Sequence, residues 1–198
     1  MCSAAEVRAL TLGEVRALYA QRLTRDFPPD ELKPLARIER ALARGEYVCY
    51  GMADGQSILA YAFFVVKGSC ALFDYLAVDS ELRDRGVGGA FLRMLLEGPL
   101  SAMGCVLLEI DDPDCAKSTE EKVRRERRRA FYLRNGLYET GVRARVYGVT
   151  YRILALPVGE RVSAEDARCV YAELYHVILP PKRYAEWVCL FPDDNGSS

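Results

Sequence analysis

The sequence predicts an α/β fold built around one core. Two patterns support this expectation: apolar runs of strand length bounded by turns, and longer segments whose apolar residues recur every three or four positions, as on one face of a helix. The chain has 198 residues, of which 51% are hydrophobic and 28% are charged. This composition is typical of a globular protein, and the length suffices for one substantial core but is short for two.

A strand, a turn and a helix follow one another in the middle of the chain. Cys70–Val78 is apolar enough to be a central strand of a sheet. Residues 79–85 are polar and end it. From residue 86 to residue 97 the apolar residues repeat with helical spacing, until Gly98-Pro99 stops the pattern. The helix therefore begins within a segment of arginines and glycines.

The start of this helix has the chemistry of an anion-binding site. A helix N-terminus carries unpaired N–H groups and partial positive charge, and glycines let an oxyanion approach the backbone. Arg83 and Arg85 add fixed positive charge, so phosphate or pyrophosphate is the expected ligand. A P-loop would need Lys-Ser/Thr after Gly89, and a dinucleotide fingerprint would need a third glycine at Phe91. The alternative is a tight turn into a packed helix with solvated arginines.

The remaining elements are predicted from hydrophobic period, turn residues and helix caps. Asp54-Gly55 marks a hairpin, while Thr11-x-x-Glu14 and Ser118-x-x-Glu121 match the capping box. The other expected strands are residues 6–10, 47–52, 58–66, 106–110, 138–147 and 150–156. The other expected helices are residues 12–24, 34–44, 119–134 and 164–179, the last with Val170, Leu174, Val177 and Ile178 facing inward and with Pro180-Pro181 ending it.

The strand, loop and helix in the middle of the chain resemble the central motif of the GNAT superfamily of acetyl-CoA-dependent N-acetyltransferases. In that superfamily the pattern Arg/Gln-x-x-Gly-x-Gly/Ala follows a strand that ends Leu-Ala-Val. Here Leu76-Ala77-Val78 precedes Arg83-x-x-Gly86-x-Gly88.

A second stretch also resembles the superfamily. Phe131-Tyr132 lies near the end of a predicted helix and precedes Asn135-Gly136-Leu137, with leucine where phenylalanine is common. The order of elements from residue 6 to about residue 156 matches the GNAT arrangement as well. The resemblance implies a mixed, mostly antiparallel central sheet of about seven strands flanked by helices on both faces. It assigns residues 1–156 to the acetyltransferase domain and leaves residues 157–198 as a C-terminal helix and tail packing on that domain.

The resemblance implies that acetyl-CoA is the cosubstrate and that its acetyl group passes directly to an amine, without a covalent enzyme intermediate. The backbone of three strand residues would pair with the pantetheine arm: Leu76, Ala77 and Val78. The loop and helix start would hold the pyrophosphate through Arg83, Asp84, Arg85, Gly86, Val87, Gly88 and Gly89. One or two arginines of the later helix meeting the 3′-phosphate are a secondary expectation.

Tyr132 is, by the same resemblance, the candidate acid that protonates the departing thiolate; the alternative is an aromatic side chain packed between helix and sheet. A reacting amine must be neutral, so a carboxylate is the usual proton acceptor. Glu109 and Asp74 both stand inside apolar strands, where a charge needs a role or a partner. Glu109 is preferred, because its strand should diverge from Cys70–Val78 at the thioester site in this superfamily. The alternatives are that both side chains point to water or an arginine, and that bulk water takes the proton.

Composition narrows the class of protein. The net charge of −1 and a pI near 6.0 give no general attraction to nucleic acid or an acidic membrane, and no apolar run approaches a membrane span. The start of the chain has no signal-peptide pattern. Seven scattered cysteines without a C-x-x-C pair predict reduced thiols in a cytoplasmic protein and no metal site. His176 is the single histidine, and a structural role is expected for it.

The residues between 122 and 129 are strongly basic but have acidic neighbours, so a solvated helix face is expected rather than nucleic-acid contact. The function predicted is therefore N-acetylation of a small-molecule or peptide amine, by a protein without nucleic-acid or membrane partners. Whether it forms a homodimer stays open. The alternative from another class is a non-catalytic module that binds or senses acyl-CoA. The acceptor would be selected by the early helices and late strands, which carry no motif.

Overall fold

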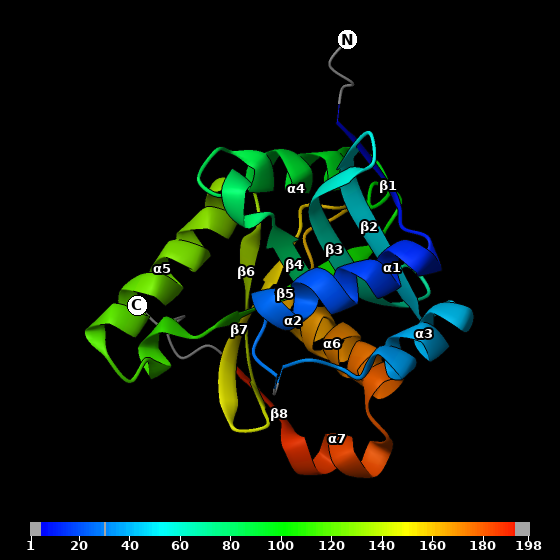
Figure 1. Ribbon diagram of the computed structural model, residues 1–198. Coiled ribbons are helices and arrows are strands. Elements are labelled where there is room, and N and C mark those ends of the chain that lie inside the picture. The colour runs from blue at the N-terminus through cyan, green and yellow to red at the C-terminus, as the bar shows by residue number, and fades with distance from the viewer. Residues whose placement is uncertain (1–4, 30, 193–198) are drawn as a thin grey trace. The chain divides into compact units, whose positions relative to one another are not determined.

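The computed structural model describes residues 5–29 and 31–192 (Figure 1). The chain forms two compact units, each built from two separate stretches. The first comprises Met1–Val66 and Asp74–Pro99, and the second comprises Lys67–Phe73 and Leu100–Ser198. The division falls within strand β4, Cys70–Val78. Residues 193–198 of the expected C-terminal tail lie outside the described residues.

The predicted α/β class and the mixed, mostly antiparallel sheet are confirmed. The strand order is β1-β2-β3-β4-β5-β7-β6-β8 in an 8-stranded sheet. Its strands are β1 Glu6–Ala9, β2 Tyr47–Asp54, β3 Ser57–Lys67, β4 Cys70–Val78, β5 Cys105–Asp111, β6 Tyr138–Val146, β7 Val149–Ala155 and β8 Val188–Pro192. The parallel pair joins Cys70, Ala71 and Leu72 of β4 to Cys105, Val106 and Leu107 of β5. The expected seven strands become eight because β8 adds an antiparallel edge to β6.

The first unit contains the early helices and the predicted cofactor loop. Its elements besides strands are α1 Leu12–Leu18, η1 Tyr19–Leu23, α2 Thr24–Asp26, α3 Leu35–Ala43, η2 Ser80–Leu82 and α4 Val87–Glu97. The capping box at the start of α1 is confirmed, because Thr11 and Glu14 each accept a hydrogen bond from the other's backbone N–H. Arg8 also donates hydrogen bonds to the Glu14 carboxylate. The bonds from Arg8 and Thr11 together lower the pKa of Glu14 to about 2.

A π-helical segment continues α1 and was not expected. η1 interrupts the regular helix at Tyr19–Leu23 and carries two buried residues, Arg22 and Leu23. π-Helical insertions are often found at functional sites. Arg22 is thus a charged residue at a buried position of this segment, where an amphipathic helix usually has an apolar residue.

The second unit contains the later strands and helices. Its elements besides strands are η3 Pro113–Cys115, α5 Thr119–Arg134, α6 Ala164–Ile178 and α7 Pro181–Trp187. Figure 1 shows the hairpin of β6 and β7. Ser118 caps α5 by accepting from the N–H of Glu121, but the Glu121 carboxylate accepts from the backbone of Lys117 instead of completing the predicted box.

The predicted end of α6 before Pro180-Pro181 agrees with the structure, in which the helix stops at Ile178. A further helix, α7, was not expected; it begins at Pro181, and proline suits a first helical turn, where its missing N–H would have no partner. The expected inward face of α6 is wrong in detail. Of the four residues expected to face inward only Leu174 is buried, and its companions are Ala167, Tyr171 and Tyr175.

A buried ion cluster closes the end of β5. Asp112 has no exposed surface. Its carboxylate forms ion pairs with Arg152, whose Nε lies 3.0 Å from Oδ1, and with the guanidinium of Arg143. Burial opposes its charged form, but the backbone N–H of Asp114 and these two arginines outweigh that effect and lower the pKa of Asp112. A carboxylate without these partners could not stay charged in such a place.

Candidate functional site

The predicted cofactor residues lie together in the first unit. β4 ends at Val78, η2 follows, and a turn over residues 83–86 leads into α4. The N-cap of α4 is Gly86, whose φ is 79°, and no side chain caps this helix end. The helix N-terminus therefore presents backbone N–H groups without the side-chain oxygen that closes α1, α5 and α6. Such an end can accept an anion.

The turn before α4 has two left-handed residues. Asp84 has a φ of 62° and Gly86 a φ of 79°. Aspartate tolerates this conformation, and glycine adopts it without strain. A Cβ added to Gly86 would meet no atom within 4 Å, so the backbone conformation and not crowding requires glycine there. The first glycine of the pattern recognised in the sequence therefore has a local physical cause.

Arg83 is held by a carboxylate that the sequence did not reveal. Its Nη2 donates to Asp26 Oδ1 at 3.3 Å and its Nε to the Val78 carbonyl at 3.4 Å. The Asp26 side chain is only 3% exposed, and the Tyr61 hydroxyl donates to its other oxygen at 3.0 Å. Arg83 itself is half-exposed. Its positive charge is thus oriented but still available at the surface.

Arg22 belongs to the same cluster and is incompletely paired. Its Nη1 donates to the Ile58 carbonyl at 2.6 Å, and its Nε lies 4.0 Å from Asp26. Within the described residues, Nε and Nη2 of Arg22 have no hydrogen-bond partner although both are buried. Sequence reasoning missed Asp26 because it lies between the two early predicted helices, residues 12–24 and 34–44, and because 57 residues separate it from Arg83.

Tyr132 lies in the second unit, near the end of α5. Its side chain is buried, its ring meets Phe131 edge-on at 5.2 Å, and the guanidinium of Arg128 lies 5.9 Å from the ring centre. Phe131 is only partly buried. The Tyr132 hydroxyl has no hydrogen-bond partner among the residues that the structure describes, so it is not committed to a structural bond.

Glu109 also lies in the second unit, on β5 opposite Ile153 of β7. Its Oε1 accepts hydrogen bonds from two tyrosine hydroxyls of α6: Tyr175 at 2.7 Å, and Tyr171. Glu109 thus has two hydroxyl partners that the sequence did not indicate. Sequence reasoning placed aliphatic residues on this face of α6 and missed the tyrosines, although their i and i+4 spacing puts both on one face.

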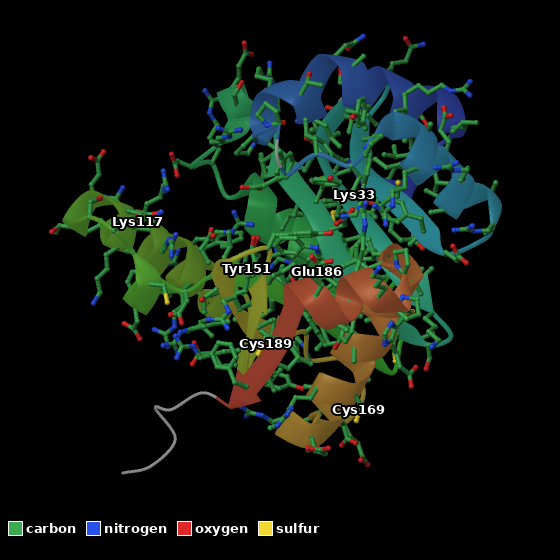
Figure 2. The ribbon with its side chains drawn as sticks, turned by 90° about the horizontal axis from the view of Figure 1, so that it is seen from below. Lys33, Lys117, Tyr151, Cys169, Glu186 and Cys189 are labelled. Atoms are coloured by element: carbon green, nitrogen blue, oxygen red, sulfur yellow. The ribbon has the colours of Figure 1, made fainter. Side chains whose placement is uncertain are left out.

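Asp74, the competing carboxylate, lies in the first unit with a cationic partner. Its side chain is 10% exposed and forms an ion pair with Lys33, and it accepts a hydrogen bond from the Tyr47 hydroxyl. Lys33 is labelled in Figure 2. Burial, with Asp74 adding to it, raises the pKa of Tyr47 well above its usual value, so Tyr47 stays a neutral donor. A structural ion pair accounts for the charge of Asp74 without a catalytic role.

The basic face of α5 is paired with acidic groups. Arg125 binds Glu121 at 2.8 Å, and Arg129 binds Glu139 at 2.7 Å. Lys122 lies 3.8 Å from Asp114. The expectation that acidic neighbours balance these charges agrees with the structure.

The described part of the chain lacks two features that would indicate another class of protein. No group of three or more histidine, cysteine or acidic side chains there is arranged to hold a metal ion. No helix there has the length and apolar character that a membrane span requires.

No model of a protein family matches the sequence, and no curated protein matches it. Solved structures do match. A GNAT-family acetyltransferase structure from Bacteroides thetaiotaomicron has a TM-score of 0.68 and 18% sequence identity, and the match covers 87% of this chain and 97% of that one. The ribosomal-protein-S18-alanine N-acetyltransferase of Escherichia coli has a TM-score of 0.55 and 20% identity, covering 80% and 97%. An aminoglycoside 6′-N-acetyltransferase complexed with coenzyme A has a TM-score of 0.55 and 16% identity, covering 79% and 99%.

These matches define the class of fold. The chain has the fold of the GNAT acetyltransferases, and the resemblance inferred from the Arg83-x-x-Gly86-x-Gly88 motif is confirmed at that level. Because the identities are low, what each of these proteins binds and modifies is a property of that protein.

Proposed function

We propose that this protein is an acetyl-CoA-dependent N-acetyltransferase that transfers the acetyl group directly to an amine. The observation that carries the proposal is the α4 N-terminus, which follows a central strand of a GNAT fold and has glycine at its N-cap without a side-chain cap. Several solved structures of this fold contain coenzyme A or acetyl-CoA. A polyphosphate group is the ligand for which that helix end is chemically suited.

Two sets of residues would hold acetyl-CoA. The backbone of Leu76, Ala77 and Val78 would pair with the pantetheine arm. The turn from Arg83 to Gly86 and the first helical residues Val87, Gly88 and Gly89 would surround the pyrophosphate. The orientation of Arg83 by Asp26 supports this assignment, because a guanidinium that is already ordered loses less conformational freedom on binding a phosphate.

Two side chains would handle protons during transfer. The amine nitrogen attacks the thioester carbonyl and gives its proton to Glu109. The C–S bond then breaks, and Tyr132 protonates the departing thiolate. The uncommitted hydroxyl of Tyr132 supports its role. The two tyrosine hydroxyls that donate to Glu109 support its role as the acceptor, whereas Asp74 is held in an ion pair with Lys33.

The acceptor is a small-molecule or peptide amine in this proposal. Structures of the same fold include enzymes named for aminoglycosides, spermidine and the alanine of a ribosomal protein. All three are amines, but they differ too much to indicate one acceptor. A cytoplasmic location is part of the proposal and is supported by the free thiols of all the described cysteines.

The test combines binding with turnover. Calorimetric titration should detect acetyl-CoA binding to the purified protein, and a free-thiol assay should detect coenzyme A release with at least one member of a panel of small amines, polyamines, amino acids and peptide N-termini. Binding without thiol release would favour the non-catalytic acyl-CoA module. Absence of binding would contradict the proposed function itself.

A further inference from the structure

The C-terminal helix α6 brings two tyrosines to one carboxylate oxygen. Tyr171 and Tyr175 both donate to Oε1 of Glu109, the latter at 2.7 Å. Their rings stack with centroids 4.6 Å apart and an interplanar angle of 28°. Tyr171 has no exposed surface, and Tyr175 is 7% exposed. Figure 2 labels Cys169 on this helix. The two hydroxyls are thus enclosed and directed at one group.

This arrangement is more than packing requires. A helix that only covers a sheet is served by leucine or isoleucine, whereas a buried tyrosine hydroxyl needs a partner to offset its lost hydration. Residues at i and i+4 lie on the same face of a helix, so the hydroxyls of Tyr171 and Tyr175 can both reach Glu109 of β5. Burial, together with the nearby Glu109, raises the pKa of Tyr171 well above its usual value, so its hydroxyl remains a neutral donor.

Hydrogen bonds donated to a carboxylate stabilise its ionised form and limit its rotation. A proton acceptor must be ionised before the reaction and must aim an oxygen at the amine.

We propose that Tyr171 and Tyr175 are positioning residues that hold Glu109 ionised and oriented for proton abstraction from the amine. The inference rests on the proposed function, in which Glu109 is the acceptor. It gives the segment after Pro157 a part in catalysis: α6 completes the site and does not merely cover the sheet.

The test starts with Tyr171→Phe and Tyr175→Phe, which keep the ring and remove only the hydroxyl. Each should lower kcat by about tenfold, the usual scale for one hydrogen bond to a charged group, and the KM for acetyl-CoA should change less than twofold. If the hydroxyls are only structural, each variant should have a lower melting temperature, and kcat should not fall selectively while the KM for acetyl-CoA stays constant.

A double-mutant cycle shows whether the tyrosines act through the carboxylate. In a Glu109→Gln protein the tyrosine substitutions should cause no further loss of kcat, because the group that they position is gone. If the tyrosine substitutions lower kcat by the same factor in the wild-type and Glu109→Gln proteins, the inference is overturned.

Tyr138→Phe is the matched control. Tyr138 lies in the same unit, and its hydroxyl accepts a hydrogen bond from the Val162 N–H at 2.9 Å. Its removal should lower stability but leave kcat unchanged. If Tyr171→Phe and Tyr175→Phe both behave like Tyr138→Phe in an active enzyme, the inference fails while the proposed function stands. If wild-type protein binds acetyl-CoA but releases no thiol with any amine, the proposed transfer fails and the inference with it.

Discussion

Gly88 is the residue on which the proposed cofactor loop depends most directly. It is the second residue of α4, where a pyrophosphate would meet the backbone. We expect Gly88→Val to abolish acetyl-CoA binding, measured by calorimetry, while the fold persists, because a branched side chain would occupy the space of the ligand. Gly13→Val is the control, since Gly13 is the second residue of α1. Unchanged affinity in a folded Gly88→Val protein would refute the assignment of the loop.

Tyr132 is expected to matter for turnover and not for binding. Tyr132→Phe keeps the ring against Phe131 and removes the hydroxyl. We expect kcat to fall by about 10²-fold and acetyl-CoA affinity to stay nearly constant, because only protonation of the thiolate is affected. The measurement is steady-state kinetics with an accepted amine under conditions where chemistry limits the rate. Full turnover in this variant would make Tyr132 a structural residue.

Glu109→Gln should show a pH-dependent defect. We expect kcat to fall by about 10²-fold or more at neutral pH, the scale for losing a positioned base, and the defect to shrink at high pH, where the amine is already neutral. Asp74→Asn is the comparison, because Asp74 is also a strand carboxylate but pairs with Lys33. A pH-dependent defect in Asp74→Asn alone would exchange the two roles. No such defect in either variant would mean that bulk water takes the proton.

At the scale of elements, the end of β5 depends on the charge of Asp112. The pKa of this carboxyl is lowered in the folded protein, so its ionisation stabilises the fold at pH values above its unfolded pKa, near 3.8, and this contribution is lost as the pH falls through the folded pKa. Asp112→Asn would remove the carboxylate that Arg143 and Arg152 share, although Arg152 keeps its ion pairs with Asp114 and Glu139. We expect the free energy of unfolding to drop by about 3 kcal/mol at pH 7, the lower end of the range for breaking a buried ion pair.

The pH dependence distinguishes this effect from a general loss of packing. Urea unfolding at neutral pH should separate wild type from Asp112→Asn, and below about pH 3.8 the difference should narrow, because wild type loses the same charge. Asp111→Asn is the control, since Asp111 has no ion pair within the described residues. A constant difference at all pH values would show that shape and not charge decides the effect.

At the scale of the whole molecule, the segment after Leu156 should be indispensable. Ala167, Tyr171 and Leu174 of α6 are fully buried, and burial of one large side chain is worth about 1.5–3 kcal/mol. We expect a chain truncated after Leu156 to lose cooperative thermal unfolding. Truncation after Pro180 removes only α7 and β8 and should be milder. A cooperative transition in the shorter chain would support the boundary at residues 156 and 157 as a true domain limit.

Much of the fold could be predicted because its causes are local. β4 has the predicted bounds, and α5 ends where Asn135-Gly136 indicated, since Gly136 has a φ of 91°. Capping residues, turn glycines and hydrophobic period act within a few residues and can be read directly. The Arg83-x-x-Gly86-x-Gly88 pattern belongs to the same class, because the left-handed N-cap needs a glycine whatever surrounds it.

The partners of the candidate catalytic groups could not be predicted, because they come from distant parts of the chain. Glu109 and Tyr175 are 66 residues apart, and Asp26 and Arg83 are 57. A carboxylate within an apolar strand signals only that some partner is needed. By itself the sequence determined the elements and the glycine-containing start of α4, through short-range backbone and capping physics. Only the tertiary structure decided which side chains meet, because burial and charge pairing depend on how the strands and helices are placed within each unit.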